Sequence, residues 1–302
     1  MNALIILLGL LLITLVFLSE GAKKHWALDL LNHFRVYYLI GLLGCGIYFS
    51  TFNTYYLFPV LTAFLLNLFR MLPSESGYIK RRSFITKEKF KLLSFNVLHS
   101  NRNFEKLNEY IQKENPDFIS LYETGKAWEK ELIELQKIYP FSYLSFAESS
   151  FGQAFFSKYP FNISEQGLRD KTTPYFLMEL VLKGSRLQMI AAHPQSPLTK
   201  KRSEHRNRQF EEMGRVLSHL QGSKILVGDL NNTPFSPYFK DLCKKANLEN
   251  NGFKSTWPAP FAPLGIPIDH FLYTPDVVVH EKKRAPNLGS DHYPLVITFS
   301  LL

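Results

Sequence analysis

The sequence is poor in cysteine, and its charge is unevenly spread. Its 302 residues include two cysteines, Cys45 in an apolar run and Cys243 in a region of mixed composition. Two isolated thiols exclude a disulfide framework and a thiolate-based metal site. Charged residues form 20% of the chain, yet residues 3–18 contain none. Any metal ligands must therefore be oxygen atoms or imidazoles, and the apolar part of the chain requires its own explanation.

The net charge of +9 does not by itself indicate a nucleic-acid-binding protein. Residues 1–90 hold 9 basic and 4 acidic side chains, whereas residues 91–302 hold 26 basic and 22 acidic side chains. More than half of the excess thus lies in the apolar third, where basic residues beside membrane spans set their orientation. The remaining +4 tolerates an anionic substrate without requiring DNA or RNA. We interpret the basic clusters at 200–202 and 282–284 as solvated charge rather than phosphate-binding sites.

Three apolar runs, at residues 3–18, 36–49 and 55–69, predict about three transmembrane helices within residues 1–72. The first run is short for a span, but a tilted helix or a thinned bilayer accommodates roughly 17 residues. A signal peptide is disfavoured because no basic residue precedes this run and residues 18–20 make a poor cleavage site. The alternative is a buried helical subdomain.

The basic residues near these runs predict which side of the membrane the rest of the chain occupies. With three spans, the link at 19–35 and the region after the third span lie on the same side. Both are basic, so the positive-inside rule places the C-terminal region in the cytoplasm of a multi-pass cell-membrane protein. The basic residues concerned are Lys23, Lys24, Arg35, Arg70, Lys80, Arg81 and Arg82.

Residues 73–89 contain proline, glycine, serine and a basic cluster, and this composition predicts a linker. Residues 90–302 then form one globular region, long enough to bury a substantial core. Alternating apolar patterns within it predict a mixture of helices and strands. We expect strands near 90–95, 118–122, 154–157, 176–182, 187–192, 224–227, 271–273 and 295–299, and helices near 103–114, 127–138 and 203–220.

The polar residues of interest all fall where predicted strands begin or end, which is where α/β and sandwich folds build their sites. They are Asn96, Glu123, His193, Asp229, Asn231, Asp269, His270, Asp291 and His292. Each motif taken alone is an ordinary turn, cap or strand end. Together, the carboxylates suit a hard cation such as Mg²⁺. The carboxylate–histidine neighbours suit acid–base chemistry, because a carboxylate fixes the tautomer of an imidazole. The set predicts metal-assisted hydrolysis of a phosphoester.

Six motifs in this order resemble the endonuclease/exonuclease/phosphatase superfamily, which has the DNase I-like fold. They are Ser-Phe-Asn-Val at 94–97, Leu-Tyr-Glu at 121–123, Ala-His-Pro at 192–194, Gly-Asp-Leu-Asn at 228–231, Thr-Trp-Pro at 256–258 leading to Ile-Asp-His at 268–270, and Gly-Ser-Asp-His at 289–292. The resemblance covers about residues 90–302. The N-terminal part, with Trp26, Asp29, His33 and Tyr38, looks like that of bacterial membrane-anchored members.

The resemblance implies a four-layer α/β sandwich, with two mixed β-sheets packed face to face and helices outside, preceded here by the transmembrane helices. It implies Mg²⁺ as cofactor, with Mn²⁺ as an alternative. Glu123 would be the principal metal ligand, assisted by Asn96, and Asp291 would bind metal or orient His292. Two departures are notable. Leu98 stands where some DNA-repair members carry an acidic ligand, which favours a single-metal site, and Tyr122 stands where a glutamine is frequent.

The resemblance also implies the roles of the remaining residues. Asp229 and Asn231 would position or activate water and hold phosphate, and His193 would bind a phosphate oxygen. Asp269 would be the acidic partner of the histidine. Whether Asp229 or His292 accepts the proton of water stays open. Arg206 and Gln209 are expected either to face substrate or to lie on a solvated helix face.

The sequence therefore predicts a membrane-anchored, Mg²⁺-dependent hydrolase of a phosphodiester or phosphomonoester. A DNA endonuclease or exonuclease is the alternative within this chemistry. A catalytically silent, membrane-tethered binding module is the alternative outside it. The substrate class (lipid, nucleotide or nucleic acid) is left open by the sequence, the bilayer is the expected partner of the N-terminal helices, and no protein partner is predicted.

Overall fold

The computed structural model of the chain describes residues 2–72, 88–146, 150–167 and 173–302. The chain divides into two compact units. Unit 1 comprises residues 1–75 together with 196–207 and 232–241, and unit 2 comprises 76–195, 208–231 and 242–302. Unit 1 is thus discontinuous in sequence. The linker expected at 73–89 lies, apart from Glu88 and Lys89, outside the described residues, and the predicted domain boundaries stay a prediction.

Unit 1 is built around an N-terminal helical bundle. Its elements are α1 (Asn2–Ser19), α2 (Trp26–Asn32), α3 (Arg35–Phe52), the short 3-10 helix η1 (Thr54–Tyr56) and α4 (Leu57–Met71). Leu12, Leu42 and Ala63, one from each long helix, lie in one buried apolar cluster. Large apolar side chains are also exposed on the outside of the bundle, for example Leu7 and Phe58. Helices that are apolar all round are typical of a protein core or of a membrane span.

Two stretches of this bundle are long and apolar enough to cross a membrane among the described residues. They are Arg35–Phe52 and Thr54–Met71, each of 18 residues, whereas Ala3–Ser19 is a shorter apolar helix. An 18-residue helix is about 27 Å long at the usual helical rise, close to the ~30 Å hydrocarbon thickness of a bilayer. Length and composition therefore support two of the three predicted spans, and insertion into a membrane stays a prediction.

The first sheet of unit 2 has six strands in the order β11-β12-β1-β2-β4-β3. The strands are β1 (Phe90–Asn96), β2 (Phe118–Tyr122), β3 (Phe141–Ser145), β4 (Gln153–Ser157), β11 (Val277–Arg284) and β12 (Leu295–Leu301). β1 and β2 are parallel and are connected through α5 (Phe104–Glu114), and the other neighbours are antiparallel. Every residue of β2 is buried, as expected of a strand covered on both faces.

The second sheet also has six strands, in the order β5-β6-β7-β8-β10-β9. They are β5 (Phe161–Gln166), β6 (Tyr175–Leu182), β7 (Ser185–Ala191), β8 (Ser223–Asp229), β9 (Glu249–Asn250) and β10 (Asp269–Tyr273). β7 and β8 are parallel, connected through α7 (Lys200–His219), and the other neighbours are antiparallel. The remaining elements are η2 (Lys126–Trp128), α6 (Glu129–Leu135), α8 (Pro237–Ala246) and η3 (Ala259–Leu264).

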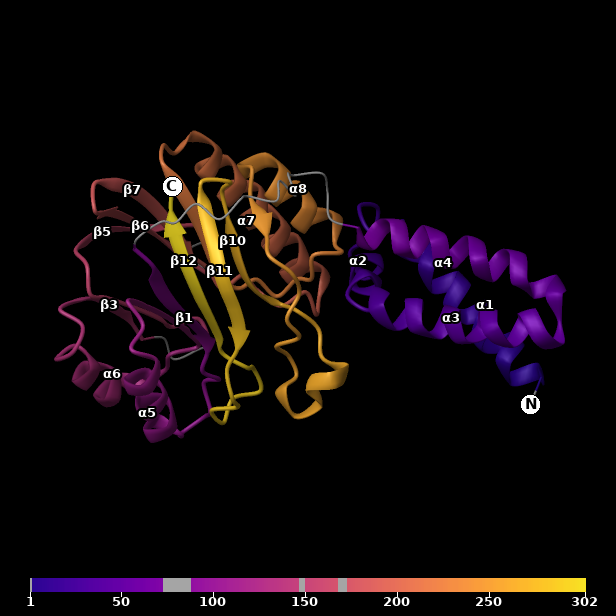
Figure 1. Cartoon of the computed structure of the whole chain (residues 1–302), viewed down its shortest axis with the longest axis horizontal. Coiled ribbons are helices and arrows are strands. Elements are labelled where there is room, and N and C mark those ends of the chain that lie inside the picture. The colour runs from indigo at the N-terminus through magenta and orange to yellow at the C-terminus, as the bar shows by residue number, and fades with distance from the viewer. Residues whose placement is uncertain (1, 73–87, 147–149, 168–172) are drawn as a thin grey trace. The chain divides into compact units, whose positions relative to one another are not determined.

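The two sheets pack face to face. Leu92 of β1 and Val227 of β8 belong to the same buried cluster, and the hydroxyl of Tyr122 donates to the carbonyl oxygen of Val227 at 3.0 Å. A second cluster joins the outer face of the first sheet to α5 and α6, for example through Leu93 and Leu107. The helices α7 and α8 lie on the side of the second sheet (Figure 1). The predicted four-layer sandwich of two mixed sheets with outer helices is thereby confirmed.

Most predicted elements are present with small shifts of their ends. β2 has the predicted bounds, and the helix expected at 127–138 is divided into η2 and α6. Among the described residues, the elements that were not predicted are α2, η1, η3, β3, β5, β9, β11 and α8. α8 begins at Pro237, and proline is favoured at the first position of a helix. The apolar pattern of this helix is short and did not stand out from the surrounding loop.

Candidate active site

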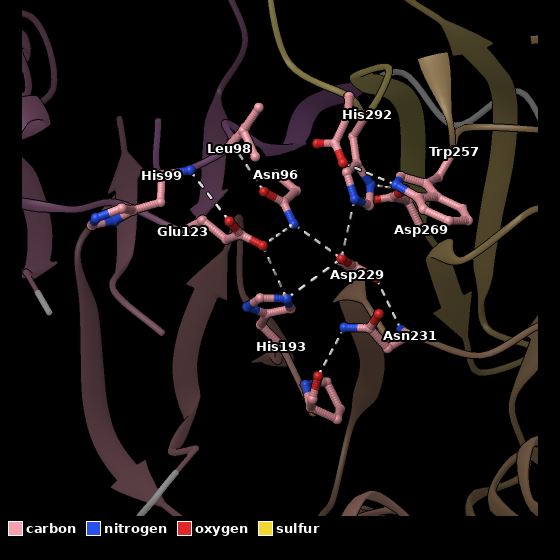
Figure 2. Close-up of polar contacts among 12 residues, drawn as sticks. Asn96, Leu98, His99, Glu123, His193, Asp229, Asn231, Trp257, Asp269 and His292 are labelled. Carbon is pink, nitrogen blue, oxygen red and sulfur yellow. Dashed lines mark hydrogen bonds and ion pairs between the residues drawn. The ribbon is translucent and has the colours of Figure 1, made fainter. Parts of the chain in front are cut away.

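Two pairs of parallel strands bring the candidate residues to one edge of the sandwich. β1 and β2 run parallel, so Asn96 at the end of β1 and Glu123 just after β2 emerge side by side. β7 and β8 do the same for His193 and Asp229. Side chains at the carboxyl ends of parallel strands share one edge of a sheet, and here the edges of two facing sheets meet (Figure 2).

Two antiparallel strands complete the site. Asp269 opens β10 and pairs in register with Asp229 at the end of β8. The segment before β12 is fastened to β1 by Ser290, whose hydroxyl donates to the backbone carbonyl of Asn96 at 2.8 Å and accepts from the backbone N–H of His292 at 3.0 Å. The Gly-Ser-Asp-His motif therefore presents its histidine to the same edge.

Left-handed backbone conformations mark the turns that leave the strands. Leu98, Glu123 and Asn231 have φ of 63°, 61° and 49°. A non-glycine residue held in this region typically costs about 1–3 kcal/mol. Gly228 has φ 151°, and a Cβ on it would overlap the carbonyl oxygen of Ala192. The residue before the catalytic aspartate candidate must therefore be glycine on steric grounds.

Asn96 links the two halves of the site. Its side-chain Nδ2 donates to Glu123 Oε1 and to Asp229 Oδ2, each at 3.0 Å. Its Oδ1 accepts from the backbone N–H of Leu98 at 3.0 Å. The other oxygen of Glu123 accepts from the backbone N–H of His99 at 3.2 Å. The amide thus holds two carboxylates from different sheets at a fixed separation.

Asp229 lies between two imidazoles (Figure 2). Its Oδ2 is 3.4 Å from His193 Nε2 and 3.6 Å from His292 Nε2. On its other ring nitrogen, His292 Nδ1 is 2.8 Å from Asp269 Oδ2. His193 Nε2 is also 3.8 Å from Glu123 Oε1. The result is a carboxylate–imidazole–carboxylate chain, Asp269–His292–Asp229, with a second imidazole beyond it.

Burial and charge set the protonation of this chain. Burial alone would raise the pKa of Asp229, but the charges and hydrogen bonds of His292, His193 and Asn96 outweigh it and lower that pKa. Burial would lower the pKa of His292, but Asp269 and Asp229 outweigh it and raise that pKa to about 10. The pKa of His193 is likewise raised, mainly by Asp229 against the effect of burial. Burial raises the pKa of Asp269, only partly offset by His292.

Asn231 and Asp291 take less central positions. The backbone N–H of Asn231 donates to Asp229 Oδ1, and its side-chain Nδ2 donates to the carbonyl oxygen of Pro194, both at 2.9 Å. Asp291 Oδ2 accepts from the indole N–H of Trp257 at 3.0 Å, and its Oδ1 is 3.5 Å from the Ser290 hydroxyl. The carboxylate of Asp291 is therefore engaged on the His292 side of the site.

The donor set suits a hard divalent cation. Ligand atoms of Asp229, Asp269 and His292 lie within 4.8 Å of one another. His292 already contacts both carboxylates, at 2.8 Å from Asp269 Oδ2 and 3.6 Å from Asp229 Oδ2, so a cation among the three would compete with these contacts. Glu123 is the more accessible carboxylate, with a side chain 16% exposed against 2% for Asp229. Oxygen ligands that keep access to water are what Mg²⁺ requires.

The structure brings together most, but not all, of the residues that the sequence analysis predicted for the site. Contacts join seven predicted residues directly: Asn96, Glu123, His193, Asp229, Asn231, Asp269 and His292. His270, next to Asp269 in β10, points to the opposite face of the strand. Ser290 and Trp257 were not predicted as site residues, although both lie inside the quoted motifs. Ser290 adjoins Asp291 in the sequence, which could have drawn attention to it, whereas Trp257 lies 34 positions before the Asp291 carboxylate that it contacts, and its motif was its only signal.

The two placements considered for Arg206 and Gln209 are both wrong. Arg206 is fully buried and forms an ion pair with Asp29. Gln209 is also fully buried, and its amide donates to the carbonyl oxygen of Thr173 at 2.6 Å and accepts from the Thr173 hydroxyl at 3.2 Å. Neither side chain faces substrate or solvent, because each has a buried partner from a distant part of the sequence.

Comparisons with known proteins agree with this architecture. The profile of the Endonuclease/Exonuclease/phosphatase family matches residues 93–292. No curated protein sequence matches the chain. Among solved structures, TDP2 of D. rerio complexed with a single-stranded DNA product is 17% identical with a TM-score of 0.59, and covers 70% of this chain and 99% of its own.

Two further structures have the same fold at similarly low identity. An endonuclease/exonuclease/phosphatase from Beutenbergia cavernae is 18% identical with a TM-score of 0.57, covering 70% of this chain and 72% of its own. The beta toxin of Staphylococcus aureus is 22% identical with a TM-score of 0.51, covering 69% of this chain and 99% of its own. At these identities the likeness concerns the fold.

Proposed function

The chain belongs to the endonuclease/exonuclease/phosphatase family, and from this membership we propose that it is a membrane-anchored, Mg²⁺-dependent phosphoesterase that cleaves its substrate by attack of water. The observation that carries the proposal is the Asp269–His292–Asp229 chain facing Glu123 and Asn96. It combines a proton-transfer system with an accessible carboxylate for a cation. Both are needed for metal-assisted phosphoester hydrolysis.

Within this site we assign the proton acceptor to Asp229. The lowered pKa of Asp229 keeps it ionised, and the raised pKa of His292 keeps the imidazole protonated near neutral pH. A protonated histidine cannot accept the proton of water, but it stabilises negative charge that develops on the phosphoryl oxygens. Asp269 orients the ring through the Nδ1 contact. Asp229 then orients the attacking water and takes its proton.

Glu123 and Asn96 are the groups that we propose to hold the cation, and Asp291 adds to its ligands or orients His292. When bound, Mg²⁺ would supply Lewis-acid polarisation of the scissile phosphoryl group. His193 and Asn231 would hold phosphate oxygens through N–H groups. The position of His193 Nε2, within 4 Å of both Glu123 and Asp229, supports this role, because a phosphate oxygen bound there lies next to the proposed cation ligands.

The activity test compares the full-length protein with its Asp229→Ala variant in detergent micelles with Mg²⁺ and a generic phosphodiester. Loss of general base catalysis typically costs about 10²–10⁴-fold in rate, and we expect a loss in this range. Asp241→Ala serves as a matched control, because Asp241 is an exposed carboxylate outside the site. Equal rates for the wild type and the Asp229 variant would refute the assignment.

The charge pattern of the bundle supports a membrane anchor. Arg35 at the start of α3 donates to Asn67 near the end of α4 at 3.1 Å and to Glu20 after α1 at 2.9 Å. Glu20 also pairs with Arg70 at 2.5 Å. Residues 2–19 and 36–69 contain no charged side chain. All charges of the bundle thus gather at one end, which we propose to be the cytoplasmic surface of the membrane.

The substrate class distinguishes the remaining alternatives. The +4 charge of residues 91–302 gives no support for a broad DNA-binding face, so a phosphoester near the membrane is our first choice over DNA. A panel of nucleic acids, phospholipids and phosphomonoesters, offered to the full-length protein, separates these classes. Hydrolysis of none of them by the wild type would favour the binding-module alternative.

A further inference from the structure

A buried carboxylate in α2 joins both of the inserted segments of unit 1. Asp29 Oδ2 pairs with Arg206 Nη2 at 2.7 Å, and the side chains of both residues are at most 1% exposed. The hydroxyl of Ser236 donates to the other oxygen, Asp29 Oδ1, at 2.8 Å. One residue of the N-terminal region therefore holds segment 196–207 through Arg206 and segment 232–241 through Ser236.

His33, which directly follows α2, adds a second contact beside Asp29, because its backbone is still helical and residues four apart are neighbours on a helix surface. The backbone N–H of Thr233 donates to His33 Nδ1 at 3.3 Å, and the Thr233 hydroxyl lies 3.2 Å from the same nitrogen. Burial and the nearby Arg206 lower the pKa of His33 to about 3. The imidazole is thus neutral and accepts the backbone N–H through an unprotonated Nδ1.

The two segments held by Asp29 and His33 follow strands β7 and β8 of the second sheet, and each begins shortly after a proposed catalytic residue. Segment 196–207 begins at the third residue after His193, which follows β7. Segment 232–241 begins immediately after Asn231, which follows Asp229 at the end of β8. Two or fewer residues therefore separate each segment from a group that would touch phosphate.

We propose that Asp29, supported by His33, is a positioning residue for catalysis: α2 clamps the segments that follow β7 and β8 and so fixes the placement of His193 and Asn231. The inference rests on the proposed function of those two residues. The two oxygens of the Asp29 carboxylate bind one partner from each segment, Arg206 and Ser236, and so fix the position of both segments along the chain. An apolar contact of equal area has no such directional requirement and would let the segments slide. The N-terminal region is then part of the catalytic apparatus as well as an anchor.

The test replaces the ion pair without leaving an unpaired charge. Removal of one member of a buried pair is strongly destabilising, whereas replacement of both by apolar residues of similar size is frequently neutral. The variant is therefore Asp29→Leu with Arg206→Met in the full-length protein in micelles. Lys23→Ala is the matched control, because Lys23 forms an exposed ion pair with Asp241 of segment 232–241, and exposed pairs contribute little.

Two properties of each variant are measured: the kinetics of hydrolysis of the phosphodiester used above, and the rate of amide hydrogen exchange. We expect kcat of the double variant to fall by about 10–100-fold, the effect of a small misplacement of reacting groups, with KM and the thermal midpoint nearly unchanged. Amide hydrogen exchange in 196–199 and 232–236 should become faster in the double variant and stay as in the wild type in Lys23→Ala. Wild-type kcat together with wild-type exchange in the double variant would overturn the proposal.

A milder variant guards against failure to fold. Ser236→Ala removes one hydrogen bond and leaves the ion pair with Arg206 in place. Faster exchange confined to 232–236 with a lower kcat supports the clamp, and no change in either opposes it. Failure of the proposed reaction is recognised separately: Asp229→Ala would then leave hydrolysis unchanged, while hydrogen exchange would still report on the clamp.

Discussion

At the active site, the acidic residues differ in their access to water, and the sequence alone does not show which of them is the most accessible. Glu123, Asp229 and Asp269 are all acidic residues beside strands, and contacts with Asn96 and His292 bring them to one edge of the sandwich. In the structure Asp229 and Asp269 are each engaged with an imidazole, while Glu123 keeps a partly exposed side chain. Their different environments arise from contacts between distant strands, and no local pattern encodes those contacts.

Replacement of Glu123 by Gln should weaken the binding of the divalent cation. The neutral amide keeps the shape of the side chain but loses the charge that attracts a hard cation. Loss of such a ligand or its support typically lowers metal affinity by about 10–100-fold, which Mn²⁺ titration followed by electron paramagnetic resonance measures. Glu129→Gln, an exposed change on α6, is the control. Unchanged Mn²⁺ affinity in Glu123→Gln would argue against its role as a ligand.

Gly228→Ala should be much more destabilising than Gly184→Ala. Both glycines have positive φ, 151° and 88°, but a Cβ at 228 meets the carbonyl oxygen of Ala192 whereas a Cβ at 184 meets nothing within 4 Å. The added overlap should cost about 1–3 kcal/mol more. Urea unfolding monitored by tryptophan fluorescence measures the difference, and equal losses at the two positions would contradict the steric explanation.

At the level of elements, the sequence identified the interior strands and missed the edges. The strands that were not predicted, β3, β5, β9 and β11, are the outermost strands of the two sheets. Interior strands are covered on both faces and read as apolar runs. Edge strands such as β5 and β11 have mostly half-buried or exposed residues, so their composition resembles that of loops. The predicted site was unaffected, because every catalytic candidate adjoins an interior strand.

The C-terminal end of α5 is tied to two strands by a charge that should make stability pH-dependent. Glu114 pairs with Lys91 of β1 at 3.2 Å and with Lys283 of β11 at 3.0 Å. Burial would raise the pKa of Glu114, but the two lysines outweigh it and lower that pKa below its ordinary value. Because the pKa is lowered in the folded state, the ionised carboxylate stabilises the fold at pH values above the unfolded pKa of about 4.3. This stabilisation is lost as pH falls through the pKa of the folded state.

Glu114→Gln should therefore lower the thermal midpoint at pH 7, and the difference from the wild type should shrink as pH falls below about 4.3, because the wild-type carboxyl is then progressively protonated. The expected loss in the free energy of unfolding at pH 7 is about 1 kcal/mol, because the lysine partners are partly exposed. Thermal unfolding followed by circular dichroism at several pH values provides the comparison. A difference between the two proteins that stays constant from pH 3 to pH 7 would exclude this ion pair as its cause.

For the whole molecule, the sequence predicted the sandwich and its site but not the composition of unit 1. The family resemblance covered about residues 90–302, and the fold there is the one expected. Segments 196–207 and 232–241 nevertheless group with the N-terminal helices. Within this group Asp29 contacts Arg206, 177 positions away, and Ser236, 207 positions away. No periodicity or motif near either residue identifies the other as its partner.

Reporter fusions at Ser74 test the orientation of the whole chain. A cytoplasmic reporter such as green fluorescent protein should be fluorescent at this position, and alkaline phosphatase, which needs export, should be inactive. The physical reason is that the charges of the bundle gather at the end to which residue 74 is connected, and positive charge is retained on the cytoplasmic side. Active alkaline phosphatase at Ser74 would place the catalytic region on the outer side.

The distance in sequence between Asp29 and Arg206 has a consequence for biogenesis. Ribosomes add about 5–20 residues per second, so the 177 intervening positions separate the appearance of the two partners by roughly 10–35 s. From the completion of α4 at Met71 until Arg206 is made, the N-terminal helices are present while Asp29 of α2 has no ion-pair partner. The nascent chain therefore carries a carboxylate without its ion-pair partner until α7 has been made, and a recombinant fragment that starts after the helices lacks Asp29, to which Arg206 is paired.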